Sequence, residues 1–413
     1  MDNLTHALIG VLISHSLVKR RDLRTAATWI GVLASNLPDI DLVTHPLFED
    51  AKLGYLVHHR GHTHTIPVAL LLLPLAMWAG LLIGRLSWPK LDTDARRALL
   101  SVGIVSVLLH MGADAWNNYG VHPFWPFWSD WIYGDFIFII EPMLWAVMLP
   151  YAIWTASSRW GKLGWSLPML GILGVLWTLP GLTTLAALLT TGLTVVSVGV
   201  QARQRSAELA LIMVLSVLSM FGWGSHTAEQ RIVAHHAAIA PRETFVDLSL
   251  TPVPAMPLCW QFVLQSRTPE QEVVQRLGHL SLNVGLLKAE SCAFRTGEAR
   301  TVQLQPLREP TMEGLQWLGG VRLPLEPLLK QAQTDCRVEA MLFFTRMPFW
   351  QVEGEALVMG DLRYDLEPAL GFSELKLDAA AQPSDCERYR AAWIPPAVQD
   401  LAAQVRTQTK GAP

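Results

Sequence analysis

The sequence predicts a mainly α fold: a polytopic bundle of membrane helices followed by a β-rich or α+β domain outside the cytoplasm. Hydrophobic residues make up 51% of the 413 residues and charged residues only 16%, whereas about a quarter of the residues in a soluble domain are charged. The long apolar runs all end near Trp223, and charged residues recur throughout the rest of the chain. We therefore expect a membrane-embedded unit over residues 1–224 and a soluble extracytoplasmic unit over residues 225–413.

The first unit contains apolar runs that are long enough to cross a bilayer. Residues 66–84 carry no charge and, as a helix, would cover a hydrocarbon core of about 30 Å. Two shorter runs, 4–18 and 25–37, are expected to be buried or partly inserted helices. Further long runs predict membrane helices at residues 98–113, 136–154, 165–179, 182–200 and 209–223.

The distribution of basic residues predicts the orientation of the helices. Short cytoplasmic loops of inner-membrane proteins are enriched in Lys and Arg. This pattern puts residues 38–65, residues 117–135 and the whole second unit on the periplasmic side of a bacterial inner membrane. No cleavable signal peptide is apparent, so we expect the first helices to target the chain. Clusters of Lys and Arg occupy residues 19–24, 85–97, 159–162 and 203–205.

The second unit carries all the cysteines and a pattern typical of β-strands. Apolar and polar residues alternate at residues 244–250, 259–264 and 337–345. An even number of cysteines in an oxidising compartment favours two disulfides, for which three pairings exist, and four unpaired thiols are the alternative. The cysteines are Cys259, Cys292, Cys336 and Cys386.

Histidines and carboxylates cluster in the membrane unit. Most of the 13 histidines lie before Pro123, although ionisable groups at membrane depth are costly and usually functional. His110 and Asp114 are four residues apart and so share one helical face. The orientation above places all of these groups at the outer ends of their helices or in outer loops. The group comprises His6, Asp39, Asp41, His59, His64, His110, Asp114, Asp135 and Glu141.

Each of these residues has a structural explanation when it is taken singly. A lone histidine on a helix is often hydrogen-bonded, and Asp39 and Asp41 follow Pro38 in a segment rich in turn-forming residues. Together, however, mixed histidine and carboxylate ligands are those of zinc or of a pair of first-row metals. The sequence therefore predicts a divalent metal site, with Zn²⁺ preferred. The aromatic residues of 116–133 are expected to form an interfacial belt or the wall of a cleft.

Five short motifs resemble those of a known family. They are Asp-x-x-Thr-His-x-x-x-Gly at 2–10, Pro-Asp-Ile-Asp at 38–41, His-Arg-Gly-x-Thr-His at 59–64, His-x-x-x-Asp at 110–114 and Asp-x-x-x-x-x-Glu at 135–141. In this order they resemble the YdjM-like (LexA-regulated) membrane-bound metal-dependent hydrolases, over roughly the first 150 to 200 residues. The sequence departs from the family pattern at Thr65, where Ser is usual, and at Glu141, where Asp is commoner.

The resemblance implies a helical site with two or three zinc ions and phosphodiester hydrolysis, through a distant similarity to zinc-dependent phospholipase C and related nucleases. Asp135 is a further candidate metal ligand, because its carboxylate is expected on the same side of the membrane. The ligands that the resemblance implies are His6, Asp39, His59, His64, His110 and Asp114.

The function expected from the sequence is that of a membrane-bound metal-dependent hydrolase. Asp41 or Glu141 would accept or orient the proton of an activated water, and the Arg60 guanidinium would hold a phosphate oxygen. A lipid or lipid-linked phosphoester is favoured because the site should open at the membrane surface. The net charge of −3 argues against nucleic acid held by bulk charge.

Two alternatives come from other classes of protein. A cation-handling protein or metal-binding scaffold would use the same ligands without activating water. A cation path predicts polar residues through to the inner face, but residues 165–200 contain no ionisable side chain. A purely structural anchor for the second unit would leave the metal motif unexplained.

Overall fold

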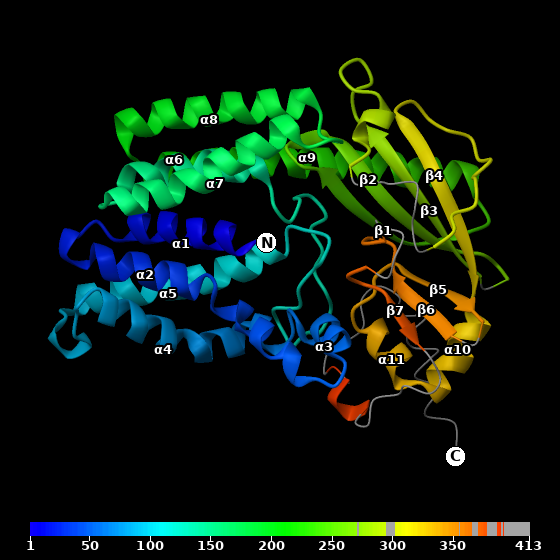
Figure 1. Ribbon diagram of the computed structural model, residues 1–413, viewed down its shortest axis with the longest axis horizontal. Helices are drawn as coiled ribbons and strands as arrows, with labels where there is room; N and C mark the ends of the chain where they lie inside the picture. The colour runs from blue at the N-terminus through cyan, green and yellow to red at the C-terminus, as the bar shows by residue number, and fades with distance from the viewer. Residues whose placement is uncertain are drawn as a thin grey trace.

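A helical half and a β-rich half lie side by side in the computed structural model, and the N-terminus lies between them (Figure 1). The helical half is formed by residues before 240 and the β-rich half by the described residues after it. A mostly helical membrane unit with a C-terminal antiparallel sheet is therefore confirmed. The structure describes the chain except residues 271, 295–301, 355, 366–370, 378–385, 390 and 392–413.

The main helices of the first half run roughly parallel to one another (Figure 1). Side chains at their N-termini satisfy free backbone N–H groups, as Asp2 does for Thr5 and Asp92 does for Ala95. The helices are α1 (Asn3–Leu17), α2 (Arg24–Ala34), α4 (Ile66–Ile83), α5 (Thr93–Asp114), α6 (Pro142–Thr155), α7 (Arg159–Thr178), α8 (Thr184–Gln204) and α9 (Ala207–Ile239).

Four of the described helices, α4, α5, α8 and α9, are long and apolar enough to cross a membrane. The expected helix at 136–154 is shorter than predicted, because α6 begins only at Pro142, which favours the first turn of a helix. Helix α7 begins in a polar stretch that includes Arg159 and Lys162, and it is not among the four candidate spans.

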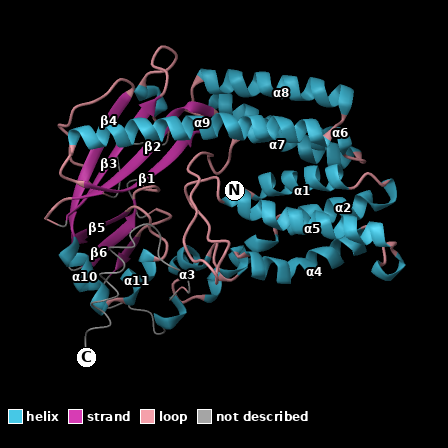
Figure 2. Cartoon of the chain, turned by 180° about the vertical axis from the view of Figure 1, so that it is seen from behind, coloured by secondary structure: helices cyan, strands magenta, loops and turns pink. Residues whose placement is uncertain are grey.

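Helix α9 connects the two halves. It has 33 residues, or about 50 Å at the usual helical rise, and it continues past Trp223 to Ile239. Its C-terminal part lies along strands β1 (Thr244–Val253) and β2 (Met256–Arg267) of the C-terminal domain (Figure 2). The boundary predicted at residue 224 therefore falls inside a continuous helix that packs on both halves.

The two ends of the bundle differ in charge. The connections that carry the basic clusters, α1 to α2, α4 to α5, α6 to α7 and α8 to α9, lie at the end away from the sheets (Figure 1). The segments 37–65 and 115–141 lie at the other end, beside the β-rich half. The C-terminal domain and the predicted metal site thus share one end of the bundle.

A close approach of two helices positions the first part of the site. Gly10 in α1 and Gly31 in α2 pack backbone to backbone, and a Cβ atom on either would overlap the carbonyl oxygen of the other. Asn3 at the start of α1 donates to Asp39 Oδ2, 2.7 Å away, just beyond the end of α2. The two N-terminal helices therefore hold Asp39 at the sheet-facing end of the bundle.

The C-terminal domain consists of two antiparallel sheets. The first has the order β1 (Thr244–Val253), β2 (Met256–Arg267), β3 (Glu272–Ser281) and β4 (Leu315–Pro324), in which Trp260 pairs with Leu280. The second has the order β5 (Pro348–Glu353), β6 (Ala356–Asp361) and β7 (Leu375–Leu377). The strands predicted at 244–250 and 259–264 are confirmed.

The strand predicted at 337–345 is wrong, because α11 (Cys336–Leu342) occupies most of this segment, after α10 (Leu325–Thr334). The Asp335 side chain accepts a hydrogen bond from Arg337 N and begins the helix. Val338, Met341 and Leu342 are buried and follow the three- and four-residue spacing of one helical face.

The cysteines form two disulfides, Cys259–Cys292 and Cys336–Cys386. The Cα atoms of the pairs are 5.0 and 6.0 Å apart, within the usual range for a disulfide. The structure thereby selects one of the three pairings that the sequence left open. Both bonds lie within the C-terminal domain.

Buried ion pairs hold the C-terminal domain on the helical half. Arg346 Nη1 lies 2.8 Å from Asp135 Oδ1, in the segment between α5 and α6, and Arg346 Nε lies 2.8 Å from Asp247 Oδ2 in β1. The same guanidinium lies over the Tyr133 ring, 4.1 Å from its centroid. Because the Arg346 side chain is only 5% exposed, these contacts are shielded from water.

Removing the central cation of this cluster should loosen the domain. Arg346→Ala leaves the buried Asp135 and the half-buried Asp247 without their cationic partner, so we expect the free energy of unfolding to fall by about 3–5 kcal/mol. Arg322→Ala is the control, because the Arg322 side chain is 57% exposed in its ion pair with Glu272 and should contribute at most about 1 kcal/mol. Denaturant unfolding of the purified chain measures both. Equal losses would contradict the role given to Arg346.

Candidate metal centre

The histidines and carboxylates of the sheet-facing end come from four separate elements. Asp39 lies in the 3-10 segment η2 (Leu37–Val43), which follows α2 and has Pro38 in its first turn. His59 follows α3 (Ala51–His58), and His64 ends the 3-10 turn η4 (His62–His64). His110 and Asp114 lie in the last turns of α5. The site therefore exists only because these element ends meet.

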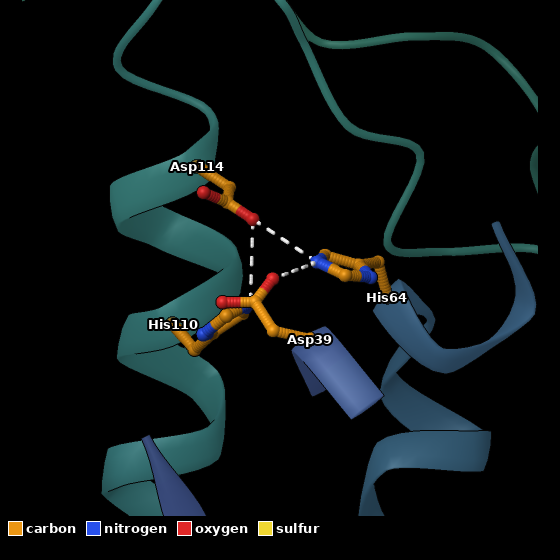
Figure 3. Close-up of side chains that lie close together, drawn as sticks. All are labelled: Asp39, His64, His110 and Asp114. Atoms are coloured by element: carbon orange, nitrogen blue, oxygen red, sulfur yellow. Dashed lines mark hydrogen bonds and ion pairs between the residues drawn. The ribbon is translucent and has the colours of Figure 1, made fainter. Parts of the chain in front are cut away.

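Asp39, His64, His110 and Asp114 form a first ligand group (Figure 3). One ligand atom from each lies within 4.8 Å of all the others. His64 Nε2 is 3.2 Å from Asp39 Oδ1 and 3.3 Å from Asp114 Oδ2, and His110 Nε2 is 3.3 Å from Asp114 Oδ2. His64, His110 and Asp114 are almost completely buried. Two imidazoles and two carboxylates are a donor set that suits zinc.

A second group consists of Asp39, Asp41 and His59, so that Asp39 belongs to both. His59 Nδ1 lies 3.2 Å from Asp41 Oδ1. Asp41 Oδ2 in turn lies 3.2 Å from His64 Nδ1 and accepts from the Thr63 hydroxyl at the same distance. A shared carboxylate between two groups of ligands is the arrangement expected where two metal ions lie close together.

The ring orientation of His110 shows which of its nitrogens can bind a metal. Its Nδ1 lies 2.7 Å from the Ser35 carbonyl oxygen, which can only accept, so Nδ1 carries the proton. Nε2 therefore offers a lone pair to the group. It lies 3.3 Å from Asp114 Oδ2, and because both atoms are then acceptors, no hydrogen bond joins them. Buried polar atoms are rarely left in this state, and a cation satisfies both.

The pKa values of His64 and Asp39 also favour a cation in the first ligand group. Although burial lowers the pKa of His64, hydrogen bonds with Asp114, Asp39 and Asp41 raise it to about 10. Burial raises the pKa of Asp39, but the hydrogen bond with His64 and the nearby His110 lower it to about 2. The carboxylates thus stabilise positive charge at this position, and a bound cation would replace the His64 proton.

His6 lies beside the first group without belonging to it. Its ring stacks on His110 with centroids 3.9 Å apart, and its Nε2 is 3.4 Å from Asp114 Oδ1. The Met1 amino group also forms an ion pair with Asp114 Oδ1. The motifs did not single out Met1 or the Ser35 carbonyl, since contacts of this kind arise only when separate elements meet.

Arg60 links the loop that carries the ligands to the end of α5. Its backbone N–H donates to Asp41 Oδ2 over 3.0 Å, and its guanidinium lies 3.0 Å from Asp114 Oδ1. The guanidinium also donates to the Gly120 carbonyl and lies over the Tyr119 ring. With a φ of 59°, Arg60 adopts the left-handed conformation that non-glycine residues rarely populate. Its contacts hold the backbone in this strained state.

The structure does not bring Asp135 or Glu141 into either group. Asp135 pairs with Arg346, as described above. Glu141 caps α6 and accepts from Met143 N at 3.0 Å and from Ala255 N, in the turn between β1 and β2, at 3.2 Å. Burial raises the pKa of the Glu141 carboxyl to about 8. These contacts join the helical half to the C-terminal domain.

These observations define a class, that of membrane-embedded helical proteins with a buried centre of histidine and carboxylate side chains. Residues 1–228, more than half of the chain, match the YdjM inner membrane protein family, and the chain belongs to this family. The predicted family and the membrane location of the helices are thereby confirmed.

One curated relative is the uncharacterized protein YfhP of Bacillus subtilis (strain 168), which shares 29% identity over 170 residues. The match covers 39% of this chain and 48% of YfhP, so the chain spans about half the length of that relative. No solved structure matches the chain.

Loss of one ligand should empty the first group. We expect His64→Ala to bind zinc at least about 100-fold more weakly than the wild type, because His64 faces three carboxylates. His62→Ala is the matched control, since His62 is exposed and belongs to neither group. Elemental analysis of the purified proteins after dialysis against zinc measures the difference. Stoichiometric zinc in His64→Ala would contradict the assignment.

Proposed function

We propose that this protein is a membrane-bound metal-dependent hydrolase that cleaves a phosphoester. One observation carries the proposal: two ligand groups that share Asp39 lie together at one end of a membrane helix bundle. The first group offers four ligands and the second offers three, which suits one or two divalent ions, with zinc preferred.

The residues around the two groups have distinct tasks. Bound zinc supplies a water of lowered pKa and polarises a phosphoryl oxygen. Asp41 contacts both His59 and His64, so it orients these imidazoles and is placed to accept a proton at its carboxylate. Arg60, through its contact with Asp114, holds the first group together, and its Nε atom is free of protein partners among the described residues.

The position of the site favours a lipid or lipid-linked substrate on the periplasmic side. The ligands lie at the end of the bundle opposite to the basic clusters, and basic loops of inner-membrane proteins face the cytoplasm. The side chains of Val43 and Leu47, close to Asp41 in sequence, are each 70% exposed, as at a membrane interface. A substrate anchored in the outer leaflet would reach such a site.

A cation-handling role is the alternative that the same ligands allow. A transport path would need polar groups along the length of the bundle. Helix α4 carries no ionisable residue, and those of α7 and α8 lie only at the ends that bear the basic clusters. The ligands are confined to one end, which favours the hydrolase.

The proposed activity should depend on both metal and Asp41. With bis(p-nitrophenyl) phosphate as the probe, we expect hydrolysis that EDTA abolishes and zinc restores. Asp41→Asn should lower the rate by about 100-fold or more, while Asp94→Asn, at the opposite end of α5, should leave it unchanged. Zinc-loaded protein that hydrolyses neither this probe nor phospholipid vesicles would favour the cation-handling alternative.

The proposed orientation has an independent test. An alkaline phosphatase reporter fused to the C-terminus of the full chain should be active, because this enzyme matures only outside the cytoplasm. The same reporter inserted after Arg205, in the connection between α8 and α9, should be inactive. The reverse pattern would place the metal centre in the cytoplasm.

A further inference from the structure

A cavity of about 360 Å³ lies between the metal centre and the C-terminal domain. His59 of the second ligand group and Arg60 form part of its wall, together with Tyr119. The opposite wall belongs to the sheet domain and includes Ser249 in β1 and Leu277 in β3. Binding pockets for small molecules usually have volumes of about 300–1,000 Å³, so this cavity is of a size that a ligand fills.

The wall of the cavity is largely apolar. On the helical side it is formed by residues 137–139, an Ile-Phe-Ile sequence that precedes α6. Water is poorly held against such a surface, because a buried water needs several polar partners. On the side of the C-terminal domain, which lies beyond the family match, the apolar lining includes Phe262, Val263, Leu277, Leu318 and Phe372.

Some polar atoms of the lining residues have no hydrogen-bond partner among the described residues. They include Arg60 Nε, the Tyr119 hydroxyl and Ser249 Oγ. Arg60 and Ser249 are each 2% exposed and Tyr119 is 6% exposed. Buried polar atoms are nearly always paired, and all three of these can donate a hydrogen bond. The two hydroxyls can also accept, but Arg60 Nε can only donate, so a ligand that satisfies all three atoms needs at least one acceptor, as a phosphate oxygen provides.

We propose that this cavity binds the substrate of the metal centre, and that the substrate class is an amphipathic phosphoester with an alkyl or acyl chain. The chain packs against Phe262, Val263 and Leu277. The oxygens of the head group accept from Arg60, Tyr119 and Ser249, next to His59. The C-terminal domain thus supplies the specificity of the enzyme. This inference rests on the proposed function, because it assigns the ligand as the substrate of the same centre.

Octyl phosphate and inorganic phosphate are the probes that test the cavity. Titration calorimetry uses the full chain in lipid nanodiscs, with empty nanodiscs subtracted, and the zinc content is measured on the same samples. We expect octyl phosphate to bind at least about tenfold more tightly than inorganic phosphate, because its chain leaves water for an apolar wall.

Two variants separate the wall from the donors. Leu277→Trp fills the cavity and should abolish the preference for octyl phosphate, whereas Leu286→Trp, at a site that is 61% exposed in the same domain, should retain it. Tyr119→Phe removes one donor without adding volume. It should weaken the binding of octyl phosphate about three- to tenfold. The thermal midpoint of unfolding should stay unchanged, since the hydroxyl has no hydrogen-bond partner among the described residues. Tyr119→Phe decides the question if Leu277→Trp does not fold.

The outcomes distinguish this inference from the proposed function. Zinc-loaded protein with the expected preference, lost in Leu277→Trp and weakened in Tyr119→Phe, supports both. If zinc binds but octyl phosphate binds no more tightly than inorganic phosphate, or equally well in both cavity variants, the inference is overturned and the metal centre stands. If octyl phosphate binds to protein that takes up no zinc, the proposed function fails, and with it the assignment of this ligand as the substrate.

Discussion

Burial of the Asp114 carboxylate is the constraint on which the sheet-facing end of the bundle depends. Asp114 is 1% exposed, and a carboxylate in this position is strongly destabilising unless charged or hydrogen-bonding groups surround it. Arg60 lies 3.0 Å away, and His64 and His110 each approach to 3.3 Å. Arg60 and His64 belong to the loop before α4, and His110 belongs to α5. Neutralising the charge of Asp114 therefore requires this loop to pack against the end of α5, and the ligand groups form where the two meet.

The same principle attaches the C-terminal domain. Asp135 in the segment after α5 is paired with Arg346, and the Arg363 guanidinium, itself paired with Asp361 at 2.7 Å, donates to the Asn118 carbonyl. Asn118 Nδ2 also donates to the Thr251 hydroxyl in β1 over 2.7 Å. Buried contacts of this kind give the domain a definite position over the candidate metal centre. The cavity next to His59 is the space that these two charge-paired surfaces enclose.

How far the sequence predicts the site depends on the kind of signal each residue has. His110 and Asp114 follow helical spacing, and Asp39 follows Pro38 in the turn after α2, so their positions could be predicted from local rules. Asp135 and Glu141 occupy the same side of the membrane, but their partners are Arg346 and the Ala255 N–H, far away in the chain. No local sequence pattern distinguishes a carboxylate in a possible metal-ligand group from one that pairs with an arginine.

The sequence by itself determined the four helices that are long and apolar enough to cross a membrane, the separation of basic loops from histidines and carboxylates, the family, and two of the strands. Apolar run length, charge distribution and motif order are properties of the sequence that can be recognised without knowledge of the tertiary packing. Only the tertiary structure decided that Asp39 joins two ligand groups, that Asp41 contacts both His59 and His64, and which cysteines pair. It also decided that segment 337–345 is largely helical and that the C-terminal domain closes over the site. These features depend on contacts between distant segments, whose geometry is set when buried charges and apolar surfaces are satisfied together.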